Sequence, residues 1–595
     1  MEENNKINKE EESNEESNED SEENSNEDEN TNKNKKNNIN NINNKEEDKN
    51  NINNKEEDKN NINNKGEDKN NEDNNENNNI NNKENNKNNI NEQNQNIVNN
   101  NEIQNEEEKN EFEEEEEEEE QLDPPRPELD EIHKQTIKLL SPSEESHHHP
   151  RTIFFMNDPE INSNKQNQGL NITEYEIKKK KFMVVYKAYK NLPQTLSGPM
   201  KYNQIIRSKL FANTNLIWKL LPREKMYLLL RKLNKFQKYN HFPVAWQLGR
   251  KDNLYTNYLK MQKKFPNEYN FMPENFILPK DKEIVDEKLK EYNVFDRENI
   301  YIVKPVASSK GRGVRILTDV TTLPNRGMLE KYIYNPHLIN KKKYDIRLYL
   351  LVTGFNPLKI YLYENGLVRF CSENYDIDPD KMNNNYVHIT NFSVNKAIAK
   401  IKSGQEDEID FATKWSIFAL KGYFLEKKLD FNPVWRRIKD IMIKLIISVF
   451  DLAIPPLKQF KLNSTNLFEL YGVDILLDDK LKPWLLECNL NPSLSCDTEV
   501  DLKVKSKLIT DILNIIGLVP FTHDGNDKPL DYPNYYKTTI EEGITESLCE
   551  FERPSGGFER IFPTKETIDI YSKLIDNPGE INYTLWDEIK GVKKK

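Results

Sequence analysis

The residues most suited to chemistry form a basic turn that contains two glycines. Residues 304–314 read KPVASSKGRGV and directly follow the apolar run 301–303. Glycine lets backbone N–H groups approach phosphate oxygens, and the side chains of Lys304, Lys310 and Arg312 would neutralise phosphate charge. The spacing matches neither the GxxxxGK(S/T) P-loop nor the GxGxxG of dinucleotide-binding proteins. The turn therefore indicates either a phosphate site of another kind or an ordinary basic hairpin.

A second polar group lies on two strongly apolar runs near residue 480. Asp474 lies within the run 468–477, and Glu487 and Asn489 lie at the end of the next run. If the two runs pair as antiparallel strands, all three side chains can share one face. Carboxylate and amide oxygens are the ligands that Mg²⁺ prefers, and a carboxylate in a buried strand needs a metal or a partner. The pattern favours a Mg²⁺ site over solvent-facing acids.

A third group alternates along one run. Lys343, Asp345 and Arg347 would lie on one face of a strand, with Arg369 on a neighbouring strand. Arginine side chains on a sheet can hold carboxylates through two parallel hydrogen bonds. A surface ladder of ion pairs would use the same residues, and both readings stay open.

The strands that must position these groups follow residue 299 as short β-rich runs. They predict an α+β core with mostly antiparallel strands. Asn365-Gly366 lies between the runs 359–363 and 367–370, which predicts a hairpin turn there. The acidic turn 478–480 joins two further strands over 468–477 and 484–488.

Helical patterns surround these strands. Residues 181–290 have a helical, basic pattern, and amphipathic helices are expected over 411–427 and 433–453. A last helix is expected over 502–516, with Asp501 favourable at its start and a stop at Gly517. Residues 518–595 are expected to form loops with one or two peripheral helices.

The chain has 595 residues, but its two ends differ in composition. Residues 1–120 hold 40 Asp and Glu against 14 Lys and Arg, whereas the rest of the chain carries a net charge of +11. The first 120 residues are rich in Asn, Glu and Lys, and include three copies of NINNK(E/G)EDKN over 41–70. Such a segment cannot bury enough apolar surface to fold, so a disordered tail is expected.

The sequence excludes several classes of protein. The N-terminus shows no signal peptide, and the longest apolar stretch, 438–455, is broken by four charged residues, so no membrane span is expected. The four cysteines have no CxxC spacing, which fits a reducing compartment. We expect a cytoplasmic monomer that binds neither membrane nor nucleic acid. The triplet 147–149 of histidines is interpreted as a solvated loop and not as a metal site.

In order along the chain, the motifs resemble the tubulin tyrosine ligase-like family, in particular its polyglutamylase branch, whose catalytic core is an ATP-grasp fold. The motifs are KPVASSKGRGV, EKYI (330–333), KYDIRLYLLV (343–352), YLYENGLVRF (361–370), HITNFSVNK (388–396) and FELYGVDILLDDKLKPWLLECNLNPSLSCD (468–497). The resemblance covers about 181–520, which is expected to be the catalytic domain. Composition indicates the tail over 1–120 and, with the prolines near 125, a linker over 121–180, and residues 521–595 are expected to be a C-terminal extension.

The resemblance also implies roles for individual residues. The residues expected to bind ATP are Lys304, Lys310, Gly311, Glu330, Lys331, Tyr332, Ile333, Lys343, Tyr344, Asp345, Thr390 and Asn391. Those expected to bind Mg²⁺ are Asp474, Glu487 and Asn489, and those expected to hold free L-glutamate are Arg369, Phe392, Ser393, Lys414 and Lys505. The residues expected to be catalytic are Lys304, Arg347 and Glu487, with Arg347 near the acceptor. Leu490 stands where chain-elongating relatives carry His, which favours starting a branch over extending one.

The implied activity is ATP- and Mg²⁺-dependent addition of glutamate to the γ-carboxylate of glutamates in tubulin C-terminal tails, through an acyl phosphate. A net charge of +11 outside the tail suits an acidic partner such as a microtubule surface, which implies a cytoskeletal location. Arg369 and Lys414 together favour an anionic donor over glycine or tyrosine. The alternatives are a glutamylase of a non-tubulin acidic protein, a glycylase, a tyrosine ligase and an inactive microtubule-binding scaffold.

The acidic run 113–120 resembles the expected substrate. We therefore hypothesise that the N-terminal tail either inhibits the enzyme or is itself modified. Unchanged activity after deletion of residues 1–120, with no tail modification detected by mass spectrometry, would exclude this hypothesis.

Overall fold

A computed structural model describes most of the chain after residue 134. The described residues are 135–143, 149–161, 170–177, 184–188, 192–208, 214–294, 296–306, 311–378, 381–391, 414–522, 529 and 539–592. The expected tail, Lys310, Phe392 and Ser393 therefore lie outside the described residues.

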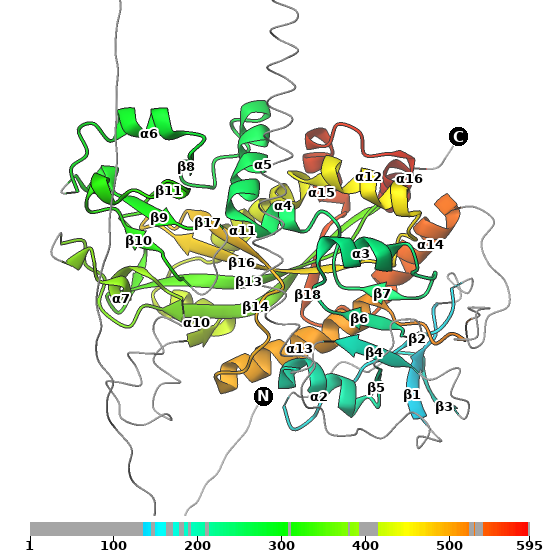
Figure 1. The fold of residues 1–595 in the computed structure, drawn as a ribbon. Helices are drawn as coiled ribbons and strands as arrows, with labels where there is room; N and C mark the ends of the chain where they lie inside the picture. Colours follow the sequence, from blue (N-terminus) through cyan, green and yellow to red (C-terminus); the bar gives the residue numbers. More distant parts are fainter. Residues whose placement is uncertain are drawn as a thin grey trace, which may run out of the picture. The chain divides into compact units, whose positions relative to one another are not determined.

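A seven-stranded antiparallel sheet lies at the centre of the fold (Figure 1). The strand order is β15–β14–β13–β16–β17, with β12 paired to β13 and β18 paired to β14. The strands are β12 (Leu338–Ile339), β13 (Lys342–Phe355), β14 (Leu358–Phe370), β15 (Lys414–Ser416), β16 (Glu469–Leu477), β17 (Pro483–Leu490) and β18 (Phe558–Phe562). The antiparallel pairing of the central strands agrees with the sequence prediction.

Helices cover both faces of this sheet, because its strands carry apolar residues on both sides (Figure 1). One face packs against α5 (Lys251–Lys264), α10 (Ile417–Glu426), α11 (Asn432–Ile447) and α12 (Phe450–Phe460). The other face packs against α2 (Gln194–Tyr202) and α13 (Glu499–Ile516). The charged candidate residues of the central strands lie on this second face.

A smaller antiparallel sheet carries the basic turn. Its order is β10–β9–β11–β8. Its strands are β8 (Asn275–Leu278), β9 (Tyr301–Lys304), β10 (Arg315–Ile316) and β11 (Gly327–Lys331), and α6 (Lys282–Lys288) packs on it. The first strands expected after residue 299 are therefore confirmed, as β9 and β10.

The N-terminal part of the fold contains strands where helices were expected. Between residues 181 and 290 a parallel sheet has the order β5–β4–β6–β7. Its strands are β4 (Val185–Ala188), β5 (Ile206–Arg207), β6 (Leu216–Trp218) and β7 (Lys238–Tyr239), and the helices of this part are α2, α3 (Arg223–Leu230), α4 (Trp246–Gly249), α5 and α6. Such short buried strands show no period of their own, so the basic helical pattern concealed them. A separate sheet, β2–β1–β3, is formed by β1 (Gln135–Leu140), β2 (Thr152–Ile153) and β3 (Ile172–Ile177).

The hairpin predicted at Asn365-Gly366 is wrong. Strand β14 runs through both residues, with an irregular register against β13 beside them, and the turn between β13 and β14 lies at Asn356-Pro357. A Cβ at Gly366 would lie 2.4 Å from the carbonyl oxygen of Arg347. Asn365 accepts a hydrogen bond from the Ile417 amide at 3.1 Å. The Asn-Gly pair therefore serves a close strand approach and the start of a helix, not a turn.

Two helix predictions needed correction at their ends. The helix expected over 411–427 begins only at Ile417, after β15, and the helix expected over 433–453 is divided into α11 and α12. The last helix, α13, agrees with the prediction, since Thr498 caps its start and Gly517 ends it at φ 60°. A short helix, α7 (Asn385–His388), precedes Thr390.

The end of the chain is part of the core and not a set of peripheral loops. Helices α14 (Thr539–Glu552), α15 (Lys565–Tyr571) and α16 (Glu580–Lys590) follow residue 538, and β18 extends the central sheet. Glu550 is buried and accepts hydrogen bonds from Lys359 Nζ at 2.6 Å and Tyr361 Oη at 2.7 Å. A buried carboxylate needs such partners, and here they lie on β14.

Two smaller expectations have different outcomes. The four cysteines are free, as the spacing predicted. His149 is buried beside Arg553, and burial lowers its pKa to about 3, so the prediction of a solvated loop is wrong for this residue. His147 and His148 lie outside the described residues. Within the described ranges no helix has both the length and the apolar composition needed to cross a bilayer.

Candidate functional site

Charged side chains form a row across five strands of the central sheet. Lys414 on β15 lies opposite Arg369 on β14, which lies opposite Asp345 on β13. Two residues further along β13, Arg347 lies opposite Asp474 on β16, and Asp474 in turn lies opposite Glu487 on β17. The alternation predicted for residues 343–347 brings these residues to one face. We call this set, with Asn489, the charged row.

Two arginines hold Asp474 within the charged row. Arg347 donates to it twice, from Nε at 2.5 Å and from Nη2 at 2.9 Å, and Arg369 Nη2 lies 2.9 Å from Asp474 Oδ2. Burial by itself would raise the pKa of Asp474, but Arg347 and Arg369 hold that pKa well below its usual range. Asp474 is therefore an ionised carboxylate in a buried strand.

Asp345 is held in a similar way on the other side of Arg369. Arg369 donates from Nε to Asp345 Oδ1 at 2.7 Å, and Thr390 Oγ1 donates to Asp345 Oδ2 at 2.7 Å. Asn391 follows Thr390 and is half-buried. The structure thus places Thr390 against Asp345, another residue that the resemblance implies for ATP binding.

The three predicted metal ligands converge. The Nδ2 atom of Asn489 lies 3.0 Å from Glu487 Oε1 and 3.3 Å from Asp474 Oδ2. Two carboxylates and a carboxamide are a donor set that suits Mg²⁺, but here the amide nitrogen of Asn489 faces the acids and both Asp474 oxygens pair with arginines. No group of three or more His, Cys, Asp or Glu side chains placed to hold a metal occurs among the described residues, because the third member here is an asparagine.

Two lysines and an acid lie where the small sheet meets the central one. Lys304 Nζ donates to Glu330 Oε1 at 2.7 Å. Lys343 Nζ lies 2.9 Å from Tyr332 Oη and 4.3 Å from the centre of that ring. Burial lowers the pKa of Lys343 to about 8. These contacts place predicted nucleotide-binding residues from both sheets beside one another.

The remaining predicted ATP residues do not all lie together. The amides of Lys331 and Tyr332 donate to backbone carbonyls at 2.8 Å, Ile333 is half-buried, and Gly311 has φ 72°. The Tyr344 side chain lies on the opposite face of β13 from Lys343 and is 2.8 Å from His337 Nδ1. Its side chain therefore does not join the other candidates.

The two lysines predicted to hold glutamate meet at an acid. Lys414 Nζ donates to Asp501 Oδ2 at 2.6 Å, and Lys505 Nζ lies 2.7 Å from Asp501 Oδ1. Lys505 Nζ also donates to the Ser495 carbonyl at 2.6 Å. The structure thus brings the two lysines together on the α13 side of the sheet, where Lys414 is the cross-strand partner of Arg369.

Sequence reasoning missed two contacts of this site. Asp501 was interpreted only as a favourable charge at a helix start, although its i, i+4 spacing to Lys505 could have indicated an ion pair. Lys251, at the start of α5, lies 3.4 Å from Glu487 Oε2. No local pattern connects Lys251 with Glu487, which lies more than 230 residues later.

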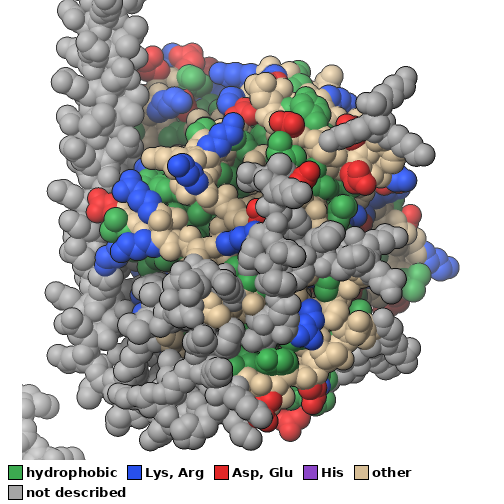
Figure 2. Space-filling view, turned by 90° about the vertical axis from the view of Figure 1, so that its right-hand side faces the viewer, with side chains coloured by type: hydrophobic (Ala, Val, Ile, Leu, Met, Phe, Trp, Pro, Cys, Tyr) green, Lys and Arg blue, Asp and Glu red, His purple; other side chains and the backbone are tan. Residues whose placement is uncertain are grey.

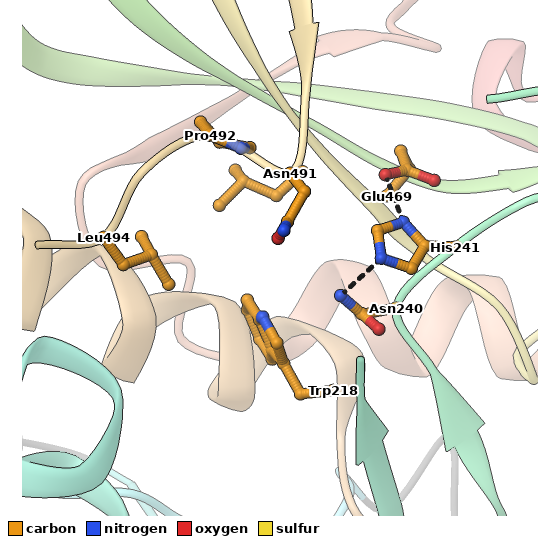
Figure 3. A pocket seen from close by; sticks show the side chains of 8 residues that line it. Trp218, Asn240, His241, Glu469, Asn491, Pro492 and Leu494 are labelled. Carbon is orange, nitrogen blue, oxygen red and sulfur yellow. Dashed lines mark hydrogen bonds and ion pairs between the residues drawn. The ribbon is translucent and has the colours of Figure 1, made fainter. Parts of the chain in front are cut away.

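A small pocket lies beyond the end of β17 (Figure 3). Its polar lining is a buried chain in which Glu469 bonds His241 at 2.8 Å and His241 lies 3.1 Å from Asn240. The other lining residues are Trp218, Leu470, Asn491, Pro492 and Leu494. None of the predicted site residues lines this pocket, so it is separate from the charged row.

Comparison with known proteins agrees with these motifs. Human tubulin polyglutamylase TTLL5 is 36% identical over 408 residues, covering 60% of this chain and 31% of that protein. Human tubulin monoglutamylase TTLL4 is 38% identical over 292 residues, covering 49% of this chain and 24% of that protein. A probable beta-tubulin polyglutamylase of Tetrahymena thermophila is 34% identical over 370 residues, covering 57% of this chain and 30% of that protein.

The matched regions span less than a third of these relatives. The family model of tubulin-tyrosine ligases matches residues 229–526, which include the charged row, the small sheet and every strand of the central sheet except β18. The chain belongs to the tubulin-tyrosine ligase family.

Proposed function

We propose that this protein is an ATP- and Mg²⁺-dependent ligase that adds glutamate to the γ-carboxylates of glutamates in acidic tubulin tails. The observation that carries the proposal is the charged row, which places two adjacent cations, Lys414 and Arg369, beside an acid and amide set suited to Mg²⁺. The names of the relatives, tubulin polyglutamylases and monoglutamylases, support the same reaction class.

The nucleotide would bind between the two sheets, in the manner of an ATP-grasp fold. Lys304, Lys310 and Lys343 would contact the phosphates, and the segment 330–333 would hold the adenine. Glu330 keeps the Lys304 ammonium at the end of β9, from which it would turn to a phosphate oxygen. ATP would supply the phosphoryl group that converts an unreactive carboxylate into an acyl phosphate.

Asp474, Glu487 and Asn489 would hold Mg²⁺, which would neutralise charge on the phosphates when it is bound. Arg347 and Arg369 keep Asp474 ionised, which a metal ligand requires. Lys251 lies against the outer oxygen of Glu487 and would orient that carboxylate.

The reaction would proceed in two balanced steps. The γ-phosphoryl group would pass to the acceptor carboxylate, near Arg347, with release of ADP. The neutral amine of free glutamate would then attack the acyl carbon, forming the isopeptide bond with loss of phosphate and one proton. Arg369, Lys414 and Lys505 would hold the carboxylates of the incoming glutamate, which places its amine at the reacting carbon.

The charge balance favours an acidic protein partner. Outside residues 1–120 the chain carries +11, and Figure 2 shows several Lys and Arg side chains gathered on the left half of one face. Such a field would speed the approach of a polyacidic tail. Tubulin is the partner that the relatives' names support.

The decisive experiment measures incorporation of labelled glutamate, glycine and tyrosine into microtubules with ATP and Mg²⁺. Wild type is compared with Glu487→Gln and with the control Glu499→Gln, which changes an exposed acid on α13 paired with Lys503. We expect glutamate incorporation by wild type and the control, and a loss of about 100-fold or more in Glu487→Gln.

Other outcomes point to the alternatives. Incorporation of glycine or tyrosine in place of glutamate would show that this other amino acid is the donor. Mg²⁺-dependent ATP binding without incorporation into tubulin would indicate a different acidic acceptor. Microtubule binding without ATP binding would indicate an inactive scaffold.

A further inference from the structure

Asp501 joins two lysines that come from different elements. It lies in the first turn of α13 and is fully buried. Its Oδ2 accepts from Lys414 Nζ on β15 at 2.6 Å and from Thr498 Oγ1 at 2.9 Å, and its Oδ1 lies 2.7 Å from Lys505 Nζ. One carboxylate therefore holds two ammonium groups, each at least 94% buried.

We propose that Asp501 is a positioning residue that holds Lys414 and Lys505 charged and side by side, and so sets the affinity of the site for a dicarboxylic amino acid. This inference rests on the proposed function, because it assigns these lysines to free glutamate. Asp501 itself would not touch the substrate.

The electrostatic reason is that two buried ammonium groups repel each other. Burial lowers the pKa of Lys414, the neighbouring Lys505 lowers it further, and Asp501 opposes both. Burial would raise the pKa of Asp501, but Lys505 and Lys414 hold it below its usual range. Without the carboxylate, burial and the neighbouring Lys505 would lower the pKa of Lys414 unopposed, and a deprotonated Lys414 could no longer pair with a substrate carboxylate.

Among the residues that the structure describes, the other groups around this cluster do not replace Asp501. Those on neighbouring elements are Arg369 on β14, Tyr349 on β13, and Cys496 and Asp497 in the segment before α13. Helix α2 carries Lys201 and Tyr202, both exposed, and α14 meets α13 at its far end through Arg553. Of these, only Asp497 brings a negative charge at neutral pH, and it lies on the exposed side.

The position of Arg369 explains why charged lysines matter here. Lys414 is its cross-strand partner, so the two cations lie side by side, with Asp501 beyond one and Asp345 beyond the other. The two outer acids hold these side chains from opposite sides. A ligand carboxylate could therefore accept hydrogen bonds from both Arg369 and Lys414, whose side chains are held next to each other.

The test is the pH dependence of the KM for glutamate in full-length Asp501→Asn, which keeps the side-chain shape and removes the charge. We expect a KM for glutamate close to wild type at pH 6.5 and raised about tenfold or more at pH 8.5, because a charged hydrogen bond is lost as Lys414 deprotonates. The KM for ATP should not change. A purely structural role would not give a KM for glutamate that recovers on acidification.

The matched control is Asp511→Asn. Asp511 lies on the same helix, is also buried, and pairs with Lys507 in the same i, i+4 arrangement at 2.7 Å, away from the charged row. Its KM for glutamate should follow that of wild type at both pH values. A second variant, Asp501→Glu, keeps the charge but moves it, and should raise the KM for glutamate without the pH dependence.

The outcomes separate the two proposals. If wild type neither binds nor incorporates glutamate, the proposed function fails, and this inference fails with it. If wild type is active and Asp501→Asn has the wild-type KM for glutamate at pH 8.5, only the inference about Asp501 is overturned. If Asp501→Asn does not fold, a wild-type KM in Asp501→Glu would overturn the inference, and a raised KM with unchanged KM for ATP would support it.

Discussion

Arg347 and Asp474 form a bidentate ion pair across adjacent strands, with Nε–Oδ1 and Nη2–Oδ2 distances of 2.5 and 2.9 Å. The two residues are direct partners in the register of β13 and β16. The pair joins Arg347, which is expected to lie near the acceptor glutamate, to Asp474, which is expected to bind Mg²⁺. Both roles therefore depend on one cross-strand contact.

Replacing Arg347 should destabilise the fold in a pH-dependent way. In Arg347→Met, Asp474 keeps only Arg369 as a cationic partner, and we expect a loss of about 3 kcal/mol in the free energy of unfolding at pH 7. The pKa of Asp474 is depressed in the folded state, so its contribution is present above its unfolded pKa of about 4 and is lost as pH falls through the folded pKa. Urea unfolding at pH 7 and pH 3.5 measures this difference.

The control is Arg223→Met, which removes an exposed arginine bonded to Tyr227. It should cost at most about 0.5 kcal/mol at both pH values. An equal cost for the two variants, or a cost for Arg347→Met that does not shrink toward acid pH, would contradict the assignment of Asp474 as a buried ionised group.

ATP binding should weaken as pH rises through about 8. The pKa of Lys343 lies at about 8 because burial disfavours its charged form, so the ammonium is lost just above neutral pH. We expect the dissociation constant for ATP to rise several-fold between pH 7 and pH 9, because a charge-assisted hydrogen bond to phosphate disappears. Equilibrium dialysis or calorimetry with ATP and Mg²⁺ measures it.

Lys343→Arg keeps a positive charge over this range and should show a flatter profile. The same titration makes a prediction for stability with the opposite sign. Between pH 8 and about 10.4 the unfolded chain binds more protons at this residue, so Lys343 makes the folded state relatively more stable as pH rises. A wild-type dissociation constant that is constant from pH 7 to pH 9 would exclude Lys343 as a phosphate contact.

Two glycine-to-alanine substitutions should have opposite effects. In Gly366→Ala the new Cβ would lie 2.4 Å from the Arg347 carbonyl oxygen, so β13 and β14 must separate. We expect a loss of about 2 kcal/mol and reduced glutamate incorporation, because Arg347 and Arg369 shift with these strands. Gly422→Ala, in α10, meets no atom within 4 Å and should stabilise the protein by about 0.5–1 kcal/mol without affecting activity. Thermal unfolding and activity of both variants test this contrast.

The segment after residue 538 should be required for a stable fold. Lys359 and Glu550 form a pair with side chains 0% and 3% exposed, between β14 and α14. Glu550→Gln leaves Lys359 buried without its counter-ion, and we expect a loss of about 3–5 kcal/mol. Replacing both residues, as Lys359→Met with Glu550→Leu, should recover much of this loss, because no buried charge then lacks a partner.

A peripheral extension would behave differently. If the segment only covered the surface, Glu550→Gln would leave the unfolding midpoint in urea unchanged. The partly exposed pair of Lys439 and Glu559 provides the comparison. Glu559→Gln should lower the free energy of unfolding by no more than about 1 kcal/mol, because solvent screens this pair.

The local patterns of the sequence were sufficient for most strands of the charged row, but not for β15, where a helix was expected. Residues 343–347 alternate with the period of a strand, so Lys343, Asp345 and Arg347 had to lie on one face if that strand formed. Helix α13 was equally predictable, because Gly517 is suited to the left-handed conformation that ends it. The motif order, confirmed by the family match over 229–526, indicated the reaction class.

Local patterns failed where the role of a residue depends on a distant contact. Asn365-Gly366 has the composition of a turn, but β13 and Ile417 keep it within a strand. Residues 216–218 form a strand because parallel neighbours hold them, and three residues are too few to show a period. The segment after 518 looked peripheral because its sequence does not reveal that Glu550 meets Lys359.

The sequence by itself therefore determined which side chains share a face, since alternation is a property of a single strand. Only the tertiary structure decided which charges meet. Arg347 and Asp474 are 127 residues apart, and Lys414 and Asp501 are 87 residues apart. Such pairs form because a buried charge is stable only beside an opposite one, and strand register together with the packing of α13 on the sheet determines which opposite charge that is.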